Sequence, residues 1–208
     1  MKLYTYFRSS ASFRVRIALN LKGLGFEQVP ISLVRNEHTR PDYLAVNPQG
    51  RVPALTVDGT VLIQSPAILE YLEEVYPEPA LLPADPIARA RVRAVCALIA
   101  CDIHPLNNSG TLAYLKGPLG HDQASVDAWY AHWIKQGFAA IEQLIRPGPF
   151  AFGAKPSLAD VYLVPQVFNA RRFNVPLEPY PKIAAVDGAC AAIEAFAAAA
   201  PARQPDAA

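Results

Sequence analysis

A proline-rich stretch, residues 77–86, divides this chain into two parts with different sequence patterns. Four of its ten residues are proline, and such a segment forms a semi-rigid connection because proline interrupts helices and strands. Both strand and helix patterns precede it, whereas only helical patterns follow it. The sequence therefore predicts an α/β domain at residues 1–79, a linker at 80–86 and an all-helical domain at 87–208.

The first part has the element order of a thioredoxin-like domain. Asp58-Gly59 stands between two apolar runs and predicts a β-hairpin. Ser65 as the N-cap and Pro66 at the first helical position predict the start of one helix, and Gly23 ends an earlier one. In chain order, the predicted elements are a strand at 3–7, a helix at 13–22, strands at 26–31, 52–57 and 61–63, and a helix at 67–76.

The second part is predicted to consist of helices. Asp122 or Ser125 is a suitable N-cap for the second helix, and Ser157 with Asp160 has the spacing of a capping box for the third. Pro165 lies inside that third helix, where it either kinks the helix or sits where its lost hydrogen bond is tolerated. The predicted helices are at 87–103, 125–145, 157–173 and 184–199.

The composition restricts the function. A net charge of +1 argues against a general nucleic-acid-binding protein, which needs an excess of basic residues. No apolar run reaches the roughly 20 residues of a membrane span, and the N-terminus carries no leader pattern. We therefore expect a cytoplasmic protein that binds neither nucleic acid nor a membrane.

The cysteines also favour a reducing compartment. Their number is odd and no CxxC pair occurs among Cys96, Cys101 and Cys190. His104 follows Cys101 at a spacing that shares a helix face, so a cysteine nucleophile is one interpretation. A small buried hydrophobic residue is the favoured one. No metal site is expected.

The turn from Arg8 to Ser12 combines a cation with three hydroxyl groups. Ser9, Ser10 and Ser12 stand between a predicted strand and the start of a predicted helix. The first N–H groups of a helix have no partner inside it, and with nearby hydroxyl groups they form a site for an anion. The alternative is that Ser9 and Ser10 only cap the helix.

Four motifs, spread over nearly the whole chain, point to one known family. They are SSASFRVRIAL at 9–19, NPQGRVP at 47–53, QSPAI at 64–68, and VPQV at 164–167 with ARRF at 170–173. Together they resemble a soluble glutathione transferase of the zeta class. The first is the most specific, because other transferase classes do not share its Arg-Ser-Ser turn. The resemblance implies the glutathione transferase architecture, glutathione as the cofactor, and a homodimer.

The resemblance assigns glutathione to the first domain. Its thiol would lie at Ser9, with Ser10 close behind, because a hydroxyl and the positive start of a helix both favour a thiolate. In the family the Val52-Pro53 bond is cis, and Gln64 with Ser65 holds the γ-glutamyl carboxylate. The residues that the resemblance assigns to cofactor binding are Ser9, Ser10, Ala11, Ser12, Phe13, Arg14, His38, Val52, Pro53, Gln64, Ser65, His104 and Asn108.

Several residues that the resemblance assigns to the site also have a purely structural interpretation. His38 falls near the glycyl end of glutathione, but an exposed loop histidine is an alternative. His104 and Asn108 face the cofactor in relatives, whereas a lone histidine on a helix is more often structural. Arg8 and Arg172 would hold the carboxylates of the substrate, with Asn108 nearby, because arginine grips a carboxylate with two parallel hydrogen bonds. A salt bridge is the alternative for both arginines, and more so for the neighbouring Arg171.

Three positions depart from the family pattern. Gly110 stands where some maleylpyruvate-type members carry an arginine, which weakens the case for a second carboxylate clamp. Ala11 stands where many members have cysteine, and Phe13 where many have tryptophan. Because Ala11 leaves no protein thiol in the turn, thiolate chemistry there must use the sulfur of glutathione.

The expected function is glutathione-dependent cis–trans isomerisation of a maleyl dicarboxylate, maleylpyruvate or maleylacetoacetate, in the degradation of aromatic compounds. Ser9, Ser10 and Arg8 would be the catalytic residues. One alternative is a general transferase or a dehalogenase that conjugates glutathione to small α-halo acids. Another is a non-catalytic glutathione-fold binding protein, against which the intact Ser9, Gln64 and Ser65 argue.

Overall fold

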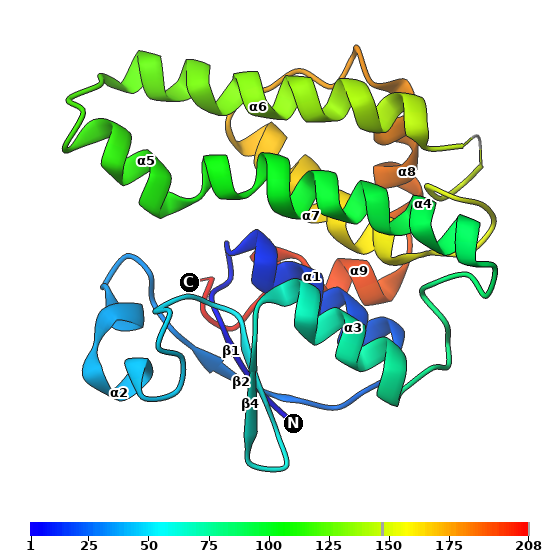
Figure 1. Cartoon of the computed structure of the whole chain (residues 1–208), viewed down its shortest axis with the longest axis horizontal. Helices are drawn as coiled ribbons and strands as arrows, with labels where there is room; N and C mark the ends of the chain where they lie inside the picture. The colour runs from blue at the N-terminus through cyan, green and yellow to red at the C-terminus, as the bar shows by residue number, and fades with distance from the viewer. Residues whose placement is uncertain (147, 208) are drawn as a thin grey trace. The chain divides into compact units, whose positions relative to one another are not determined.

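The computed structural model describes residues 1–146 and 148–207 (Figure 1). The chain forms two compact units. Unit 1 comprises Met1–Leu81 together with the C-terminal segment that starts at Ala191, and unit 2 comprises Leu82–Cys190. The C-terminal segment thus packs with the first unit, whereas the sequence pattern placed it with the helical domain. Its contacts with unit 1, described below, are long-range contacts that helical periodicity does not reveal.

Unit 1 is built on a mixed four-stranded sheet of order β2-β1-β3-β4. The strands are β1 (Lys2–Thr5), β2 (Glu27–Pro30), β3 (Ala54–Val57) and β4 (Thr60–Ile63). β1 is parallel to β2 and antiparallel to β3, and β3 pairs with β4 as a hairpin. The hairpin turns through Asp58 and Gly59, at φ 47° and 81°, as a two-residue turn requires. The predicted thioredoxin-like α/β arrangement is confirmed.

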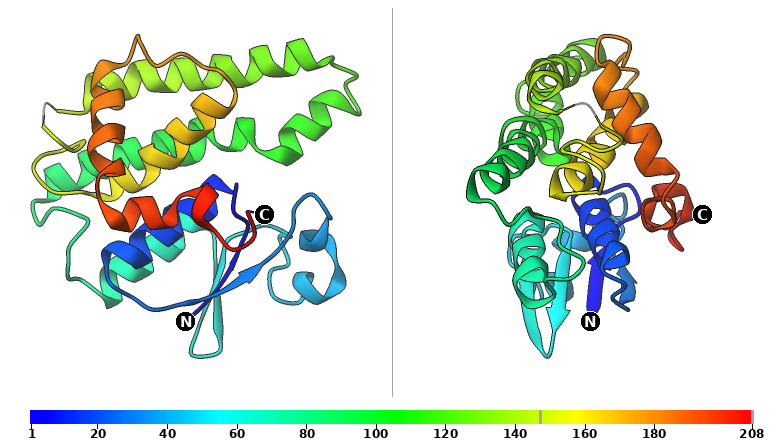
Figure 2. Two further views of the ribbon diagram at one scale, coloured as in Figure 1. Left: turned by 180° about the vertical axis from the view of Figure 1, so that it is seen from behind. Right: turned by 90° about the vertical axis from the view of Figure 1, so that its right-hand side faces the viewer.

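The main helices of unit 1 are α1 (Ser10–Leu21), α3 (Ser65–Val75) and α9 (Glu194–Ala199), with the shorter η1 (Glu37–Thr39), α2 (Pro41–Leu44) and η4 (Pro201–Arg203). α1 lies beside both α3 and α9 (Figure 2). It begins at Ser10, before the predicted start at residue 13, because Ser9 caps it: Ser9 Oγ accepts a hydrogen bond from Ser12 N at 3.2 Å.

A buried ion pair joins the ends of α1 and α3. Lys22 Nζ lies 2.6 Å from Glu73 Oε1, and the Lys22 side chain has no exposed surface. Lys22 Nζ also donates to the carbonyls of Tyr76 and Pro79, and the Glu73 carboxylate accepts from Leu81 N. Both charges are therefore paired and hydrogen-bonded, which a buried ion pair requires.

Unit 2 contains helices and helical turns in the residues that the structure describes. Asp122 caps α6 through Ser125 N at 2.8 Å. Ser157 and Asp160 form the predicted capping box at α7, which continues through Pro165. The elements are α4 (Pro86–Ala97), the π-helical η2 (Leu98–Ile103), η3 (Pro105–Asn107), α5 (Ser109–Lys116), α6 (Gln123–Leu144), α7 (Leu158–Arg172) and α8 (Pro181–Ala191).

Two predicted helices are divided in the structure. The helix expected at 87–103 is α4 followed by the π-helical η2. The helix expected at 184–199 is α8 and α9, separated where Ile193 takes an extended conformation. Asn20 Nδ2 of α1 donates to the carbonyl of Ala195 at 3.0 Å, a tertiary contact that helix propensity does not show. None of the described helices is both long and apolar enough to cross a membrane.

Candidate active site

The start of α1 has the features of an anion site. Ser9 is extended (φ −69°, ψ 114°), and its hydroxyl oxygen caps Ser12 N while its carbonyl accepts from Phe13 N. No acidic residue lies in the first turn, so no carboxylate of that turn offsets the positive end of the helix dipole. The cap uses a lone pair of the Ser9 hydroxyl and leaves its proton to donate. Capping and anion binding are therefore compatible at Ser9.

The other predicted residues of this helix are buried. Ser10, Ala11, Ser12, Phe13 and Arg14 are each at most 9% exposed. Ser12 Oγ has no hydrogen-bond partner among the described atoms.

Arg8, which precedes this turn, is held in place by two aromatic side chains. Its Nη2 donates to the Tyr6 hydroxyl at 2.9 Å. The guanidinium carbon lies 5.8 Å from the centre of the Tyr6 ring and 5.1 Å from that of Phe7, within the range of a cation–π contact. A guanidinium has several N–H donors, and the bond to Tyr6 uses one of them. Arg8 is therefore a pre-positioned cation beside Ser9. Sequence reasoning missed the role of Tyr6.

The start of α3 is a second anion site. The predicted N-cap, Ser65, is wrong: Gln64 occupies the cap position, Ser65 is the first helical residue, and no side chain caps this helix. No acidic residue lies in its first turn. The first N–H groups therefore lack the side-chain acceptor that most helices provide.

Gln64 and Ser65 are held by long-range hydrogen bonds. Gln64 Nε2 donates to Gln49 Oε1 at 2.6 Å, and Arg14 Nη1 donates to the buried Ser65 Oγ at 3.4 Å. Gln64 has φ 69°, a left-handed conformation that a residue other than glycine adopts at some cost and that often marks a functional site. This hydrogen bond joins the NPQGRVP motif, which contains Gln49, to the QSPAI motif, which contains Gln64.

The third predicted segment lies between these two. The Val52-Pro53 bond is cis, as the family resemblance implied. Gly50, at φ 61°, allows a close approach, since a Cβ there would lie 3.1 Å from the carbonyl oxygen of His38. His38 is half-buried, and burial lowers the pKa of its imidazole. The structure thus brings His38 next to the loop that leads to Pro53.

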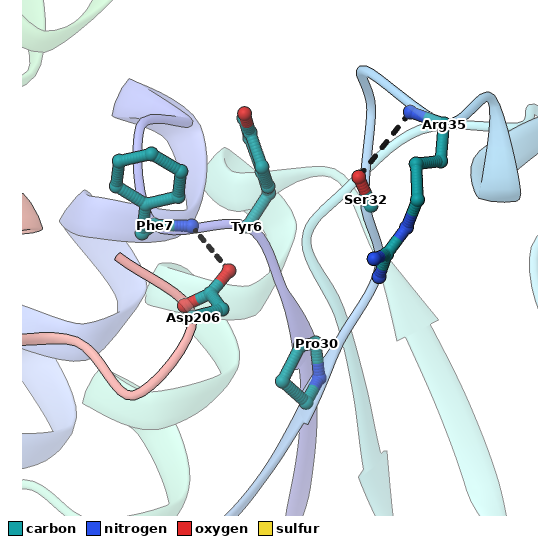
Figure 3. Close-up of a pocket in the computed structure, with 6 residues that line it drawn as sticks. All are labelled: Tyr6, Phe7, Pro30, Ser32, Arg35 and Asp206. Carbon is teal, nitrogen blue, oxygen red and sulfur yellow. Dashed lines mark hydrogen bonds between the residues drawn. The ribbon is translucent and has the colours of Figure 1, made fainter. Parts of the chain in front are cut away.

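A pocket lies beside the Arg8 turn (Figure 3). Its volume is about 280 Å³. Figure 3 shows that its wall combines the end of β1, the end of β2 with the loop that follows it, and the C-terminal segment. The lining residues are Tyr6, Phe7, Pro30, Ser32, Arg35 and Asp206.

In unit 2, His104 and Asn108 lie close together in the chain. His104 follows η2 and is half-buried. Asn108 caps α5, because its Oδ1 accepts from Gly110 N at 2.9 Å and Thr111 N at 3.1 Å. The amide nitrogen of Asn108 takes no part in that cap. A structural role for Asn108 is therefore present, and it leaves a donor for a ligand.

Arg171 and Arg172 differ in their contacts. Arg171 Nη1 lies 2.6 Å from Asp187 Oδ2 in an ion pair. Arg172 is exposed and packs over the ring of Phe173 at 4.9 Å, and Phe173 in turn stacks on Tyr130. The ion-paired arginine is Arg171, so Arg172 is the better candidate to receive a carboxylate. α7, which carries Arg172, packs against η2.

The predicted site residues thus fall into two groups, one in each unit. In the described part of the chain, no three His, Cys, Asp or Glu side chains cluster in a way that would hold a metal ion. The arrangement in unit 1 offers hydrogen-bond donors and positive charge, and its chemistry is that of binding an anionic ligand.

Comparison with known proteins agrees with this chemistry. Two family models match the chain, the glutathione S-transferase N-terminal domain at residues 1–74 and C-terminal domain at residues 123–186. A maleylacetoacetate isomerase of Pseudomonas aeruginosa is 58% identical over 99% of this chain and 98% of its own length.

Two solved structures are similar over 100% of both chains. One, the holo form of maleylpyruvate isomerase, a bacterial glutathione S-transferase of the zeta class, is 54% identical with a TM-score of 0.98. The other, maleylacetoacetate isomerase of Methylobacterium extorquens AM1 with bound malonate and glutathione, is 38% identical with a TM-score of 0.96.

Proposed function

Since this chain belongs to the zeta class of the glutathione S-transferase family, we propose that it is a glutathione-dependent cis–trans isomerase of a maleyl dicarboxylate. The reaction converts maleylpyruvate or maleylacetoacetate to the fumaryl isomer. The observation that supports this reaction best is Arg8, held by Tyr6 beside the uncompensated start of α1. That arrangement provides a cation for a substrate carboxylate directly next to a site for a thiolate.

The residues of unit 1 fit glutathione. The start of α3 has neither an acidic residue nor a side-chain cap, so its donors suit the γ-glutamyl carboxylate. Gln64 and Ser65 are held there by Gln49 and Arg14. When bound, glutathione supplies the thiolate that adds reversibly to the double bond and so permits rotation. Ser9 donates to the sulfur, and the start of α1 lowers the thiol pKa.

The chain's own residues then bind and orient the substrate. Arg8 and Arg172 hold its carboxylates and stabilise the negative charge that develops as the double bond is lost. We assign Ser10 to the support of Ser9, and we assign His104 and Asn108 to ligand binding. A small α-halo acid such as chloroacetate has one carboxylate, whereas a maleyl dicarboxylate has two, so two cations favour isomerisation.

Three further features belong to this proposal. The glutathione-binding domain occupies residues 1–79 and the substrate domain begins at 87, after a linker at 80–86. The C-terminal segment, which packs with unit 1, is the departure from that division. Two copies of the chain form a homodimer, and the protein acts in the cytoplasm.

The test is to follow maleylpyruvate and maleylacetoacetate by ultraviolet absorbance with glutathione, without it, and with S-methylglutathione, which has no thiol. We expect turnover only with glutathione, and glutathione recovered unchanged. Consumption of glutathione with chloroacetate, without isomerisation, would show the transferase instead. Retention on immobilised glutathione without any turnover would show a binding protein.

A further inference from the structure

The backbone of Phe7 is held at both its N–H group and its carbonyl, which belong to the successive Tyr6–Phe7 and Phe7–Arg8 peptide units. Phe7 N donates to Asp206 Oδ2 at 2.9 Å, and Arg16 Nη2 donates to the carbonyl of Phe7 at 3.0 Å. Figure 3 shows the Asp206 carboxylate directed at this N–H group. β1 ends at Thr5, so a side chain receives this N–H beyond the end of the strand. Arg8 and Ser9 follow Phe7 directly.

Arg16 is a buried anchor for the same segment. It is 1% exposed, and its Nη1 donates to Thr5 Oγ1 at 2.9 Å and to the carbonyl of Tyr6 at 3.4 Å. Its Nε donates to the carbonyl of Ala199 at 3.1 Å. Burial lowers the pKa of Arg16 to about 10, and the negative charge of Asp206 acts in the opposite direction. The guanidinium is therefore charged at neutral pH, and Asp206 supplies part of the compensation.

The C-terminal segment that carries Asp206 is fixed to unit 1. Gln204 Nε2 donates to the carbonyls of Ala198 and Ala200, at 2.8 and 2.9 Å. Gln204 Oε1 accepts from Gln28 Nε2 at 3.2 Å, beside the end of β2. Gln204 itself is 6% exposed. Asp206 therefore reaches Phe7 from a segment that Gln204 anchors to unit 1.

We propose that Asp206 is a positioning residue for catalysis: its carboxylate, with Arg16, fixes the two peptide units that flank Phe7 and so sets the direction of Arg8 and Ser9. This inference rests on the proposed function. Arg8 depends on Phe7 in a second way, since the guanidinium packs over the Phe7 ring. A change in the backbone conformation at Phe7 would move both the cation and the Ser9 hydroxyl, and small misplacements of such groups are costly in rate.

The competing role for Asp206 is only to neutralise Arg16. The two roles predict different results when Asp206 is replaced by asparagine. Asp206→Asn keeps a side-chain oxygen that accepts from Phe7 N but removes the charge, whereas Asp206→Ala removes both. Glu194→Gln is the matched control, because Glu194 is an exposed carboxylate on the same segment and pairs with Arg203 at 2.8 Å.

The experiment measures three quantities for each variant: kcat and KM with the maleyl substrate, the thiol pKa of bound glutathione from thiolate absorbance, and thermal unfolding. We expect Asp206→Ala to lower kcat about tenfold and to have a higher thiol pKa than Asp206→Asn, which equally lacks the charge, with the KM for glutathione changed less than about twofold. Asp206→Asn should recover most of the loss in kcat, and Glu194→Gln should match the original protein.

Equal losses in Asp206→Asn and Asp206→Ala would overturn the positioning role and leave charge compensation. An unchanged kcat in Asp206→Ala, with the same thiol pKa as in Asp206→Asn, would overturn it as well. If Asp206→Ala does not fold, Asp206→Asn decides, since retention of activity without the charge supports positioning and its loss does not. The thiol pKa is measured without substrate, so failure of the isomerase assay with the original protein is a separate result.

Discussion

Arg14 Nη1 lies 3.4 Å from Ser65 Oγ, so a buried side chain of α1 contacts the first turn of α3. The two helix starts that we assign to glutathione are thereby joined, one at its sulfur and the other at its γ-glutamyl carboxylate. A change at either helix start should therefore alter the kinetics with glutathione. We expect a change at the start of α3 to raise the KM for glutathione, and a change at the start of α1 to lower kcat.

Ser65→Ala should weaken binding of glutathione without changing the chemical step. Loss of a hydrogen bond to a charged group corresponds to about a tenfold rise in KM for glutathione. The kcat should stay nearly constant, because the contact is the same in the ground state and the transition state. Initial rates at varied glutathione check this, with Ser125→Ala, an exposed serine in the first turn of α6, as the control. A fall in kcat at constant KM would contradict the assignment.

Ser9 should show separate effects on stability and on the thiol. Ser9→Ala removes the cap of α1 and should lower the free energy of unfolding by about 1 kcal/mol. It should lower kcat by about tenfold or less, because the helix start still favours the thiolate. Ser9→Asp should restore the cap but raise the thiol pKa, since a negative charge then lies beside the sulfur. Urea unfolding and thiolate absorbance measure the two effects. If Ser9→Asp restores both, Ser9 is only a cap.

Arg8 should determine the affinity for the dicarboxylate. Arg8→Ala should lower kcat/KM for the maleyl substrate about 100-fold, as expected for loss of a paired charge. Tyr6→Phe should have a smaller effect, because the ring remains and only the hydrogen bond to Arg8 Nη2 is lost. The KM for glutathione should change little in either variant. Arg203→Ala, an exposed arginine of the C-terminal segment, is the control, and an equal loss there would rule out a specific role for Arg8.

The cysteines should be dispensable for activity. Cys101→Ala should retain full turnover, because the reacting thiol belongs to glutathione. Cys101 is exposed, so its interpretation as a small buried residue is wrong. In the folded protein iodoacetamide should modify Cys101, whereas Cys190 should resist because burial raises the pKa of its thiol. Mass spectrometry before and after unfolding counts the modified sites. Loss of turnover in Cys101→Ala would support the alternative that Cys101 is a nucleophile beside His104.

Lys22→Met should destabilise unit 1. Removing one partner of a buried ion pair leaves Glu73 uncompensated and should cost about 3–5 kcal/mol of unfolding free energy. The double variant Lys22→Met with Glu73→Leu should lose less than the sum of the single variants. Lys2→Met is the control, since Lys2 and Glu27 form an exposed pair at 3.6 Å and should contribute less than about 1 kcal/mol. Additive losses in urea unfolding would show that Lys22 and Glu73 do not interact.

The sequence predicted best what short-range chemistry determines. Asp58-Gly59 predicted its hairpin because few residue pairs accept two left-handed conformations in succession. Asp122 and the Ser157–Asp160 pair predicted helix starts because a side-chain oxygen there meets an N–H a few residues along. Ser9 was assigned from the family resemblance, and the structure shows that its hydroxyl also caps α1.

The features that the sequence did not predict depend on tertiary contacts. The break between α8 and α9 was missed because alanine favours a helix on both sides of Ile193. Ser65 was predicted as the N-cap, but Gln64 occupies that position. The left-handed conformation of Gln64 is not predicted by the residues around it. Asp206 lies in no motif, since the bond that joins it to Phe7 spans 199 residues. Arg16 lies inside the SSASFRVRIAL motif, but its bond to Phe7 was not predicted.

The discontinuity of unit 1 has a consequence for its biosynthesis. Its sheet and first helices emerge from the ribosome before all of unit 2, but α9 and Asp206 emerge after it. About half of the polypeptide must therefore be translated after the α/β layer before Phe7 N–H can donate to Asp206. If Asp206 has the positioning role that we propose, the active-site turn lacks until then the acceptor that fixes the backbone at Phe7.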